Sequence, residues 1–134
     1  MILLLDTNIC IYLIRGRPPE ALRRFEGYAV GEIGVSSITV AELHFGVSKS
    51  RQPEKNRQAL EQFLLALEIV GFDGNAAVAY GRIRAELEAK GTPIGPLDTL
   101  IAAQAIALDS TLVTNNIGEF SRVPGLEVED WSSV

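Results

Sequence analysis

The stretch ILLLDTN, residues 2–8, decides the fold class of this chain. Four consecutive apolar residues are typical of a short strand buried on both faces, as in a parallel sheet covered by helices. Ligands of open α/β sheets bind just beyond the carboxyl ends of the strands. Asp6 stands at that position, although Asp, Thr and Asn also favour turns and helix caps. The stretch therefore predicts a central parallel strand that ends in either a cap or a site.

The rest of the chain alternates between strand-like and helix-like segments. Further strands are predicted near residues 33–37, 69–72, 111–114 and 126–128, and helices near residues 37–49, 53–70, 75–91 and 97–108. Asn75 is the predicted cap of the third of these helices, and Gly91 is its predicted terminator. This alternation predicts an α/β protein with a parallel sheet flanked by helices, built as a single domain over residues 1–134.

Composition limits the class of protein. With 134 residues, 47% of them apolar and 22% charged, the chain can bury a core and is not disordered. Its one cysteine, Cys10, excludes an internal disulfide and a cysteine-based zinc cluster, and it fits a reducing compartment. The first apolar run is too short for a signal peptide or a membrane span. We therefore expect a cytoplasmic protein with no membrane partner.

The formal net charge is −5, which does not suggest binding to nucleic acid by bulk charge. The basic residues are nevertheless grouped along the chain: Arg15, Arg17, Arg23 and Arg24; Lys49, Arg51, Lys55 and Arg57; and Arg82 with Arg84. A solvated helix face is the simpler explanation of each group, and a surface that holds a nucleic-acid backbone is the alternative.

Acidic and amide side chains follow the predicted strands or open the predicted helices. They are Asp6, Glu42, Asp98, Asn115, Asn116 and Glu119. Each has a local alternative: Thr39 and Glu42 match a capping box, Asp98 suits a helix N-terminus, and the two asparagines suit a turn. Together, however, they fall at element ends that a parallel sheet gathers on one edge. The pattern predicts an acidic pocket made from four distant segments.

The ligand chemistry of such a pocket points to a hard cation. Clustered carboxylates repel one another unless a cation or a shared proton relieves them. Oxygen ligands without histidine or thiolate suit Mg²⁺ or Mn²⁺. His44 is the only histidine, so a zinc hydrolase site is unsupported, and the chain has neither a nucleophile elbow nor a phosphate-binding loop.

Four motifs in order then resemble a known family. They are LLLDTNICIYLI, SSITVAELHFGVSKS, GRIRAELEAKGTPIGPLDTLIAAQA and LVTNNIGEFSRVPGLEVEDW. Together they cover most of the chain, which resembles a PIN-domain ribonuclease and, within that group, the VapC-type toxins of bacterial toxin–antitoxin pairs. The resemblance implies a three-layer α/β/α domain with a parallel sheet of about five strands. It also implies a toxin endoribonuclease that hydrolyses phosphodiester bonds of RNA, with tRNA as a candidate substrate.

The resemblance also implies roles for particular residues. The catalytic set carried over from the family is Asp6, Glu42, Asp98 and Asn116, with Asp6 and Asp98 as ligands of Mg²⁺ or Mn²⁺. Asn116 departs from the family, because many PIN domains have a fourth acid at that position. Glu119 is a nearby carboxylate that could compensate. Thr7, Asn8 and Thr114 match supporting polar positions, and we expect Thr7 and Asn8 to fix the orientation of Asp6.

Two other functions compete with this interpretation. Because Asn116 removes one charge, the chain could be a non-catalytic PIN-like binding module. Asp6 could instead accept a phosphoryl group, but phosphatases of that kind need a second acid two residues later, where this chain has Asn8.

The family resemblance finally predicts protein partners. It implies a VapB-type antitoxin, which we expect in a groove lined by helices near residues 9–14 and 43–67. A homodimer is also predicted, because the interior of one small domain has limited room for the large apolar side chains of the helix after residue 53. They are Leu60, Phe63, Leu64 and Leu67.

Overall fold

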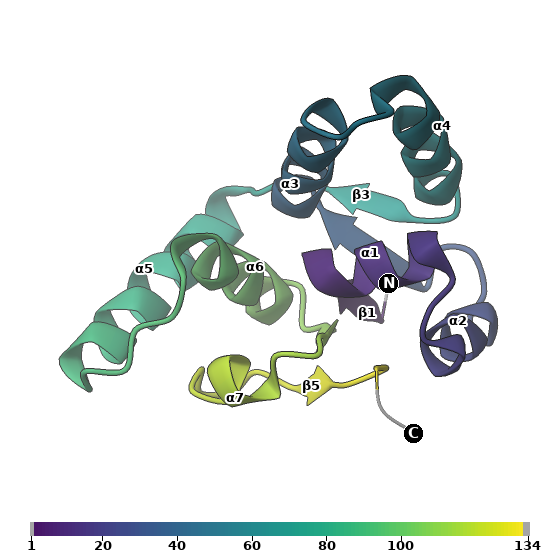
Figure 1. Ribbon diagram of the computed structural model, residues 1–134. Coiled ribbons are helices and arrows are strands. Elements are labelled where there is room, and N and C mark those ends of the chain that lie inside the picture. The colour runs from purple at the N-terminus through teal and green to yellow at the C-terminus, as the bar shows by residue number, and fades with distance from the viewer. Residues whose placement is uncertain (1, 133–134) are drawn as a thin grey trace.

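A five-stranded parallel sheet forms the centre of the computed structural model, which describes residues 2–132 (Figure 1). Its strands are β1 (Leu3–Leu5), β2 (Ile33–Ser36), β3 (Glu68–Val70), β4 (Thr111–Val113) and β5 (Val128–Glu129). They lie in the order β3-β2-β1-β4-β5, and Leu4 of β1 pairs with Gly34 and Leu112 on either side. The first strand of the chain is therefore the middle of the sheet, and its carboxyl end is the centre of one edge.

Helices cover both faces of this sheet, as the sequence predicts. The first group is α1 (Thr7–Arg15), α2 (Pro19–Glu26), α3 (Ser37–Ser48) and α4 (Pro53–Leu64). The second is α5 (Gly74–Ala89), α6 (Pro96–Ala107) and the short α7 (Ile117–Phe120). In Figure 1, α5 and α6 lie together on one side of β1, away from α1, α2 and α4. The three-layer α/β/α prediction is confirmed.

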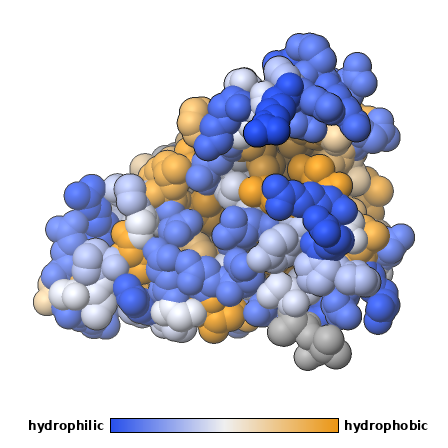
Figure 2. Space-filling view, viewed as in Figure 1, coloured by the Kyte–Doolittle hydropathy of each residue, from blue (hydrophilic) through white to orange (hydrophobic). Residues whose placement is uncertain are grey.

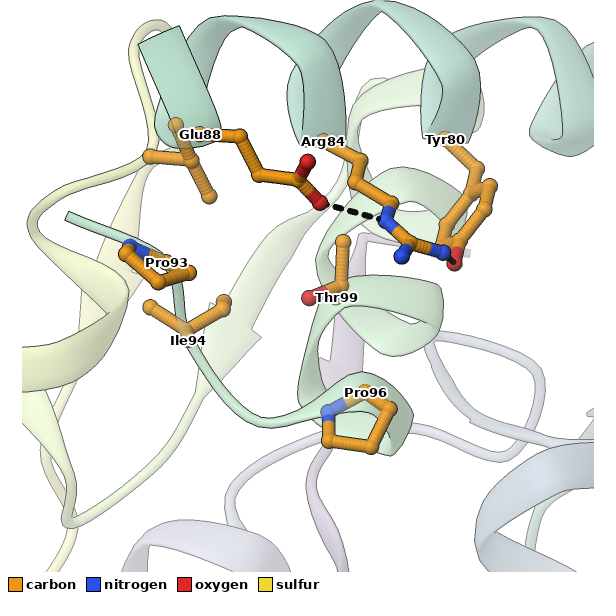
Figure 3. A pocket seen from close by; sticks show the side chains of 8 residues that line it. Tyr80, Arg84, Glu88, Pro93, Ile94, Pro96 and Thr99 are labelled. Carbon is orange, nitrogen blue, oxygen red and sulfur yellow. Dashed lines mark hydrogen bonds and ion pairs between the residues drawn. The ribbon is translucent and has the colours of Figure 1, made fainter. Parts of the chain in front are cut away.

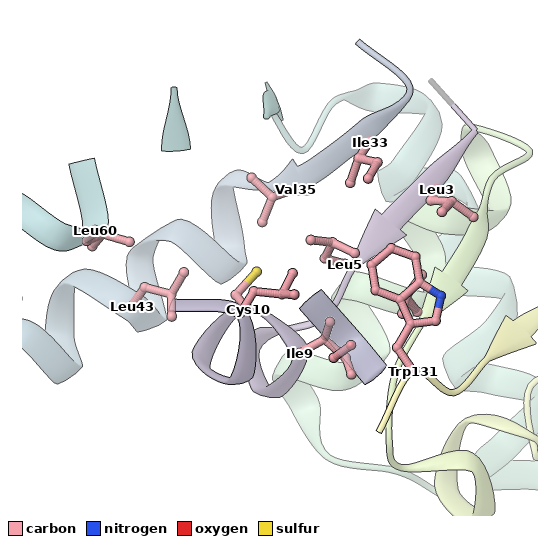
Figure 4. Close-up of a cluster of buried hydrophobic side chains, with 12 residues drawn as sticks. Leu3, Leu5, Ile9, Cys10, Ile33, Val35, Leu43, Leu60 and Trp131 are labelled. Carbon is pink, nitrogen blue, oxygen red and sulfur yellow. The ribbon is translucent and has the colours of Figure 1, made fainter. Parts of the chain in front are cut away.

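Alternate residues of β1 point into two separate cores. Leu3 and Leu5 join the cluster formed with the first group of helices, whereas Leu4 joins the cluster of α5 and α6. Figure 4 shows the first cluster, in which Trp131 lies close to β1 and Ile9. Trp131 is fully buried and stacks on Tyr28, with ring centroids 5.9 Å apart. The apolar run 2–5 thus has two buried faces because each face packs against its own layer of helices.

Two helix boundaries differ from the sequence prediction. The helix predicted over residues 53–70 ends at Leu64, because residues 68–70 pair with β2 as strand β3. The cap of α5 is Asp73 and not Asn75: Asp73 Oδ1 accepts a hydrogen bond from the Ala76 amide at 3.0 Å. Asn75 already lies within the helix. Gly91 follows the end of α5 with φ of 70°, as its predicted role requires.

The capping box that was the local alternative for Thr39 and Glu42 does not form. Helix α3 begins at Ser37, and Ser36 caps it by accepting a hydrogen bond from the Ile38 amide. Thr39 is therefore inside the helix, and Glu42 is free to point elsewhere. Helices α2 and α7 were not predicted from the sequence. Among the described residues, none of the helices has the length and apolar character of a membrane span.

Candidate active site

The carboxyl edge of the sheet places four acidic side chains within electrostatic reach of one another. Asp6 follows β1, Glu42 lies in α3 directly after β2, and Asp98 lies in the first turn of α6. Glu119 lies in α7, just beyond β4. Burial raises the pKa of Asp98, and the charges of Glu119, Asp6 and Glu42 raise it further, as expected for acids that lie near one another.

Asp6 is the most enclosed of these acids, with only 5% of the residue exposed. It caps α1: its Oδ1 accepts a hydrogen bond from the Ile9 amide at 2.9 Å. Burial is the main reason why its pKa is raised, and hydrogen bonds from Thr114 and two backbone amides oppose that shift. The cap interpretation of ILLLDTN is therefore confirmed, and the same carboxylate lies near Glu42 at the acidic pocket.

Glu42 is held by a hydroxyl group from the first motif. Thr7 Oγ1 donates a hydrogen bond to Glu42 Oε1 at 2.7 Å, and it lies 3.3 Å from the hydroxyl of Thr39. Thr7 and Glu42 are 35 residues apart in the chain. The structure thus corrects the expectation that Thr7 orients Asp6. Thr114 has that contact, and Asn8 contributes its backbone amide while its side chain is exposed.

Asp98 and Glu119 form the second half of the pocket. The pKa of Asp98 is raised to about 6. Burial is the largest cause, and the charge of Glu119, a hydrogen bond with Glu119 and the charges of Asp6 and Glu42 are the further causes. Glu119 Oε1 accepts a hydrogen bond from the Gly95 amide at 2.7 Å. A Cβ at Gly95 would lie 3.5 Å from Asp98 Oδ2 and 3.6 Å from Glu119 Oε1, so this glycine brings the backbone close to both carboxylates.

Asn116 supports the pocket through Glu119. Its side-chain amide donates to Glu119 Oε2 at 2.5 Å, and its backbone amide donates to Thr114 Oγ1 at 2.9 Å. The neighbouring Asn115 donates to the Tyr12 hydroxyl at 2.7 Å, across 103 residues of sequence. Sequence reasoning missed Tyr12, because a contact between such distant segments has no local signature.

The donor set fits a hard divalent cation. Every side chain of the pocket offers oxygen, the ligand atom that Mg²⁺ and Mn²⁺ prefer, and a cation would relieve the repulsion between clustered carboxylates. Within residues 2–132, no three His, Cys, Asp or Glu side chains already form a closed group of ligands. The carboxylates would therefore have to move together around an ion.

The sequence matches the PIN domain family over residues 3–126. The chain belongs to the PIN-domain family. It is 49% identical to Ribonuclease VapC2 of Rickettsia felis, with 98% of each chain covered, and 44% identical to the tRNA(fMet)-specific endonuclease VapC of Salmonella typhimurium, with 96% of each covered. Within its family, this PIN domain is thus a member of the VapC group.

Solved structures agree with this assignment. This PIN domain superposes on a chain of DNA-bound VapBC from Salmonella typhimurium with a TM-score of 0.93 and 44% identity, covering 98% of both chains. VapBC2 from Rickettsia felis bound to a promoter DNA fragment gives a TM-score of 0.92 and 48% identity, covering 98% of this chain and 99% of that chain. The resemblance noted from the four sequence motifs is confirmed.

Proposed function

We propose that this PIN domain is the toxin of a toxin–antitoxin pair and hydrolyses phosphodiester bonds of RNA with Mg²⁺ or Mn²⁺ bound at its acidic pocket. The observation that carries this proposal is the meeting of Asp6, Glu42 and Asp98 at the carboxyl edge of the sheet in a VapC-group chain. The tRNA-specific activity named for the Salmonella relative makes tRNA the first substrate to test.

Asp6 and Asp98 are the proposed metal ligands, and each lies at the start of a helix. Asp6 caps α1 through its bond with the Ile9 amide, and Asp98 lies in the first turn of α6. Bound metal would lower the pKa of a water molecule and stabilise charge on the scissile phosphate. Glu42, held by Thr7, is placed to orient the attacking water. Asn116 acts through Glu119, which it holds beside Asp98.

A purified-protein assay tests the chemistry. Initiator tRNA is incubated with the wild type and with Asp98→Asn, Glu42→Gln and Asp6→Asn, in Mg²⁺, in Mn²⁺ and in chelator. Asparagine at position 6 keeps an oxygen that can cap α1, so its loss of activity would not follow from a lost cap. We expect cleavage only by the wild type with metal, whereas Glu61→Gln, an exposed carboxylate change on α4, stays active.

The same variants, expressed in a host without antitoxin, test toxicity. Each pocket variant is expected to leave growth unaffected at protein levels matched to the wild type. Growth arrest by Asp98→Asn would contradict the site assignment. A folded wild type that binds tRNA without cutting it in either metal would instead favour the non-catalytic binding module.

The partner proposal rests on a groove next to the pocket. A cavity of about 420 Å³ lies between α1, α3 and α4, lined by apolar side chains that include Ile11, Ile14, Leu43, Val47 and Leu60. Figure 2 shows these orange, apolar side chains in the hollow between α1 and the α3–α4 pair. Thr7 and Glu42 also line it, so the groove reaches the acidic pocket. A VapB-type antitoxin segment lying here would carry a basic side chain to the carboxylates and block catalysis.

A further inference from the structure

A second pocket lies between α5, α6 and the loop that joins them. Its volume is about 230 Å³, and its lining includes Tyr80, Arg84 and Glu88 from α5 with Ile94, Pro96 and Thr99 from the loop and α6. Figure 3 shows the three α5 side chains above the hollow, facing the prolines and Thr99 below it. The groove proposed for the antitoxin shares none of these lining residues.

The loop between α5 and α6 contributes neighbouring residues to this pocket and to the acidic pocket. Gly95 donates its amide to Glu119 and lies beside Asp98, whereas its neighbours Ile94 and Pro96 line the second pocket. Ile94 and Pro96 are the sequence neighbours of Gly95, and consecutive Cα atoms are about 3.8 Å apart. The two pockets are therefore separated by only one or two residues of this loop. A ligand that occupied both would need to extend only a short way across the loop.

The polar groups of the pocket form a fixed set of donors and acceptors. Arg84 Nε donates to Glu88 Oε2 at 2.7 Å, and Arg84 Nη1 donates to the Tyr80 hydroxyl at 2.9 Å. These two bonds orient the exposed guanidinium and leave other N–H groups of its five available for a ligand. Leu87 and Ile94 are the apolar residues of the lining, and Tyr80 contributes an aromatic ring.

We propose that this pocket takes an unpaired nucleobase of the RNA next to the scissile phosphate. The inference rests on the proposed ribonuclease function. Unstacked RNA bases are recognised by stacking on aromatic rings and guanidinium planes and by hydrogen bonds at their edges. Glu88 disfavours a phosphate here, because its carboxylate beside Arg84 would repel an anion. A base edge instead presents both donors and acceptors, which match the pair of Glu88 and Arg84.

Protein variants combined with abasic RNA test the pocket. Short single-stranded RNAs that carry the mapped cleavage sequence are made with one abasic nucleotide at each position around the cut. We expect one abasic position to raise KM about tenfold for the wild type. Arg84→Gln and Tyr80→Ala are expected to raise KM for intact RNA by a similar factor and to show no further penalty at that position.

The control is Arg82→Gln. Arg82 is an exposed arginine of the same helix that lines a different cavity, so its loss removes the same charge without touching the pocket. We expect it to keep the wild-type abasic profile. Binding of the same RNAs to an Asp98→Asn background, which does not cleave, provides a second readout that does not depend on turnover.

An abasic profile that is identical in wild type, Arg84→Gln and Tyr80→Ala would overturn the base pocket while leaving the ribonuclease proposal intact. Absence of metal-dependent cleavage by the wild type would overturn the ribonuclease proposal itself. Melting temperatures of each variant separate a lost contact with RNA from a weakened packing of α5 on α6.

Discussion

Asp98 combines two properties that rarely occur together in a carboxylate: it is partly buried, and three other acids lie within electrostatic reach. Both disfavour its ionised form, burial most strongly, and its pKa rises to about 6. The folded state therefore binds a proton at Asp98 more tightly than the unfolded state does.

The first prediction concerns the pH dependence of stability in chelator. Between the unfolded pKa of 3.8 and the folded pKa of about 6, the folded state holds more protons at Asp98, so its contribution to stability falls as pH rises. Urea unfolding at several pH values should show this fall in the wild type and lose most of it in Asp98→Asn. Glu61→Gln should behave like the wild type. Parallel curves for the wild type and Asp98→Asn would show that the acids do not interact as described.

The second prediction adds a charge where many PIN domains have one. Asn116→Asp replaces the amide that donates to Glu119 with a carboxylate that repels it. We expect a lower melting temperature in chelator and a larger rise on adding Mg²⁺ than in the wild type. An ion at a hundredfold excess over its dissociation constant stabilises by about 2.7 kcal/mol. Equal Mg²⁺ effects in Asn116→Asp, Asp98→Asn and the wild type would argue against a metal site.

At the scale of elements, the strand ends bring the acids together, and side-chain caps begin three of the helices. Asp6 caps α1, Ser36 caps α3 and Asp73 caps α5, each through a side-chain oxygen that accepts from a backbone amide. Only the first of these caps belongs to the acidic pocket. The other two allow the structural role of a cap to be measured separately from catalysis.

The third prediction uses the cap of α5. Asp73→Ala removes the acceptor of the Ala76 amide and should lower the free energy of unfolding by about 0.5–2 kcal/mol without loss of activity. Asn75→Ala is the matched control, because Asn75 is exposed within the helix and should change stability little. Urea denaturation of both variants provides the measurement. A larger loss from Asn75→Ala would mean that the helix begins where the sequence suggests.

The fourth prediction concerns the groove between α1, α3 and α4. Val47→Asp places a charge among its apolar side chains and should weaken antitoxin binding at least tenfold while tRNA cleavage persists. Ser48→Asp adds the same charge at an exposed position of α3 and should bind like the wild type. Titration calorimetry with the antitoxin compares them. Unchanged affinity in Val47→Asp would place the antitoxin elsewhere.

Much of the fold was predictable because β1 is a buried apolar run and because strand and helix segments alternate along the rest of the chain. The acids were predictable as a group because each follows a strand or opens a helix. The hydrogen bonds around these acids were not predictable. Thr7 bonds to Glu42 and Tyr12 bonds to Asn115, and the partners are 35 and 103 residues apart in the sequence. Only the assembled sheet brings them together. The helix caps were hard to predict for a related reason: several side chains near the start of a helix could each accept a hydrogen bond from a backbone amide.

At the scale of the whole molecule, the argument for a homodimer has to change. The apolar side chains expected to be in excess are used within the chain: Leu60 is fully buried, and Phe63, Leu64 and Leu67 pack against the first core. Three of the exposed large apolar residues in the described part of the chain lie within other helices. They are Phe45 on α3, Val78 on α5 and Leu97 on α6, which are 66%, 72% and 43% exposed.

The fifth prediction therefore moves the dimer contact to these residues. We expect the purified chain to be a dimer by light scattering at tens of micromolar, roughly the range where weak interfaces still form. Phe45→Glu and Val78→Glu should shift it toward monomer, because a buried charge opposes association. Leu65→Glu, a 76% exposed apolar position after α4, is the control. A wild type that is already monomeric at this concentration would contradict the prediction.

The burial of Trp131 gives the molecule a built-in optical probe. It is the only tryptophan, it stacks on Tyr28 next to α2, and its indole N–H donates to Glu129 at 3.0 Å. Arg24 of α2 forms an ion pair with the same carboxylate at 3.2 Å. The indole is therefore linked through Glu129 to helix α2. Its emission therefore reports on the first core, beneath α1–α4, and not on the core under α5 and α6. Comparing fluorescence with circular dichroism during unfolding would reveal whether the two faces of the sheet melt together.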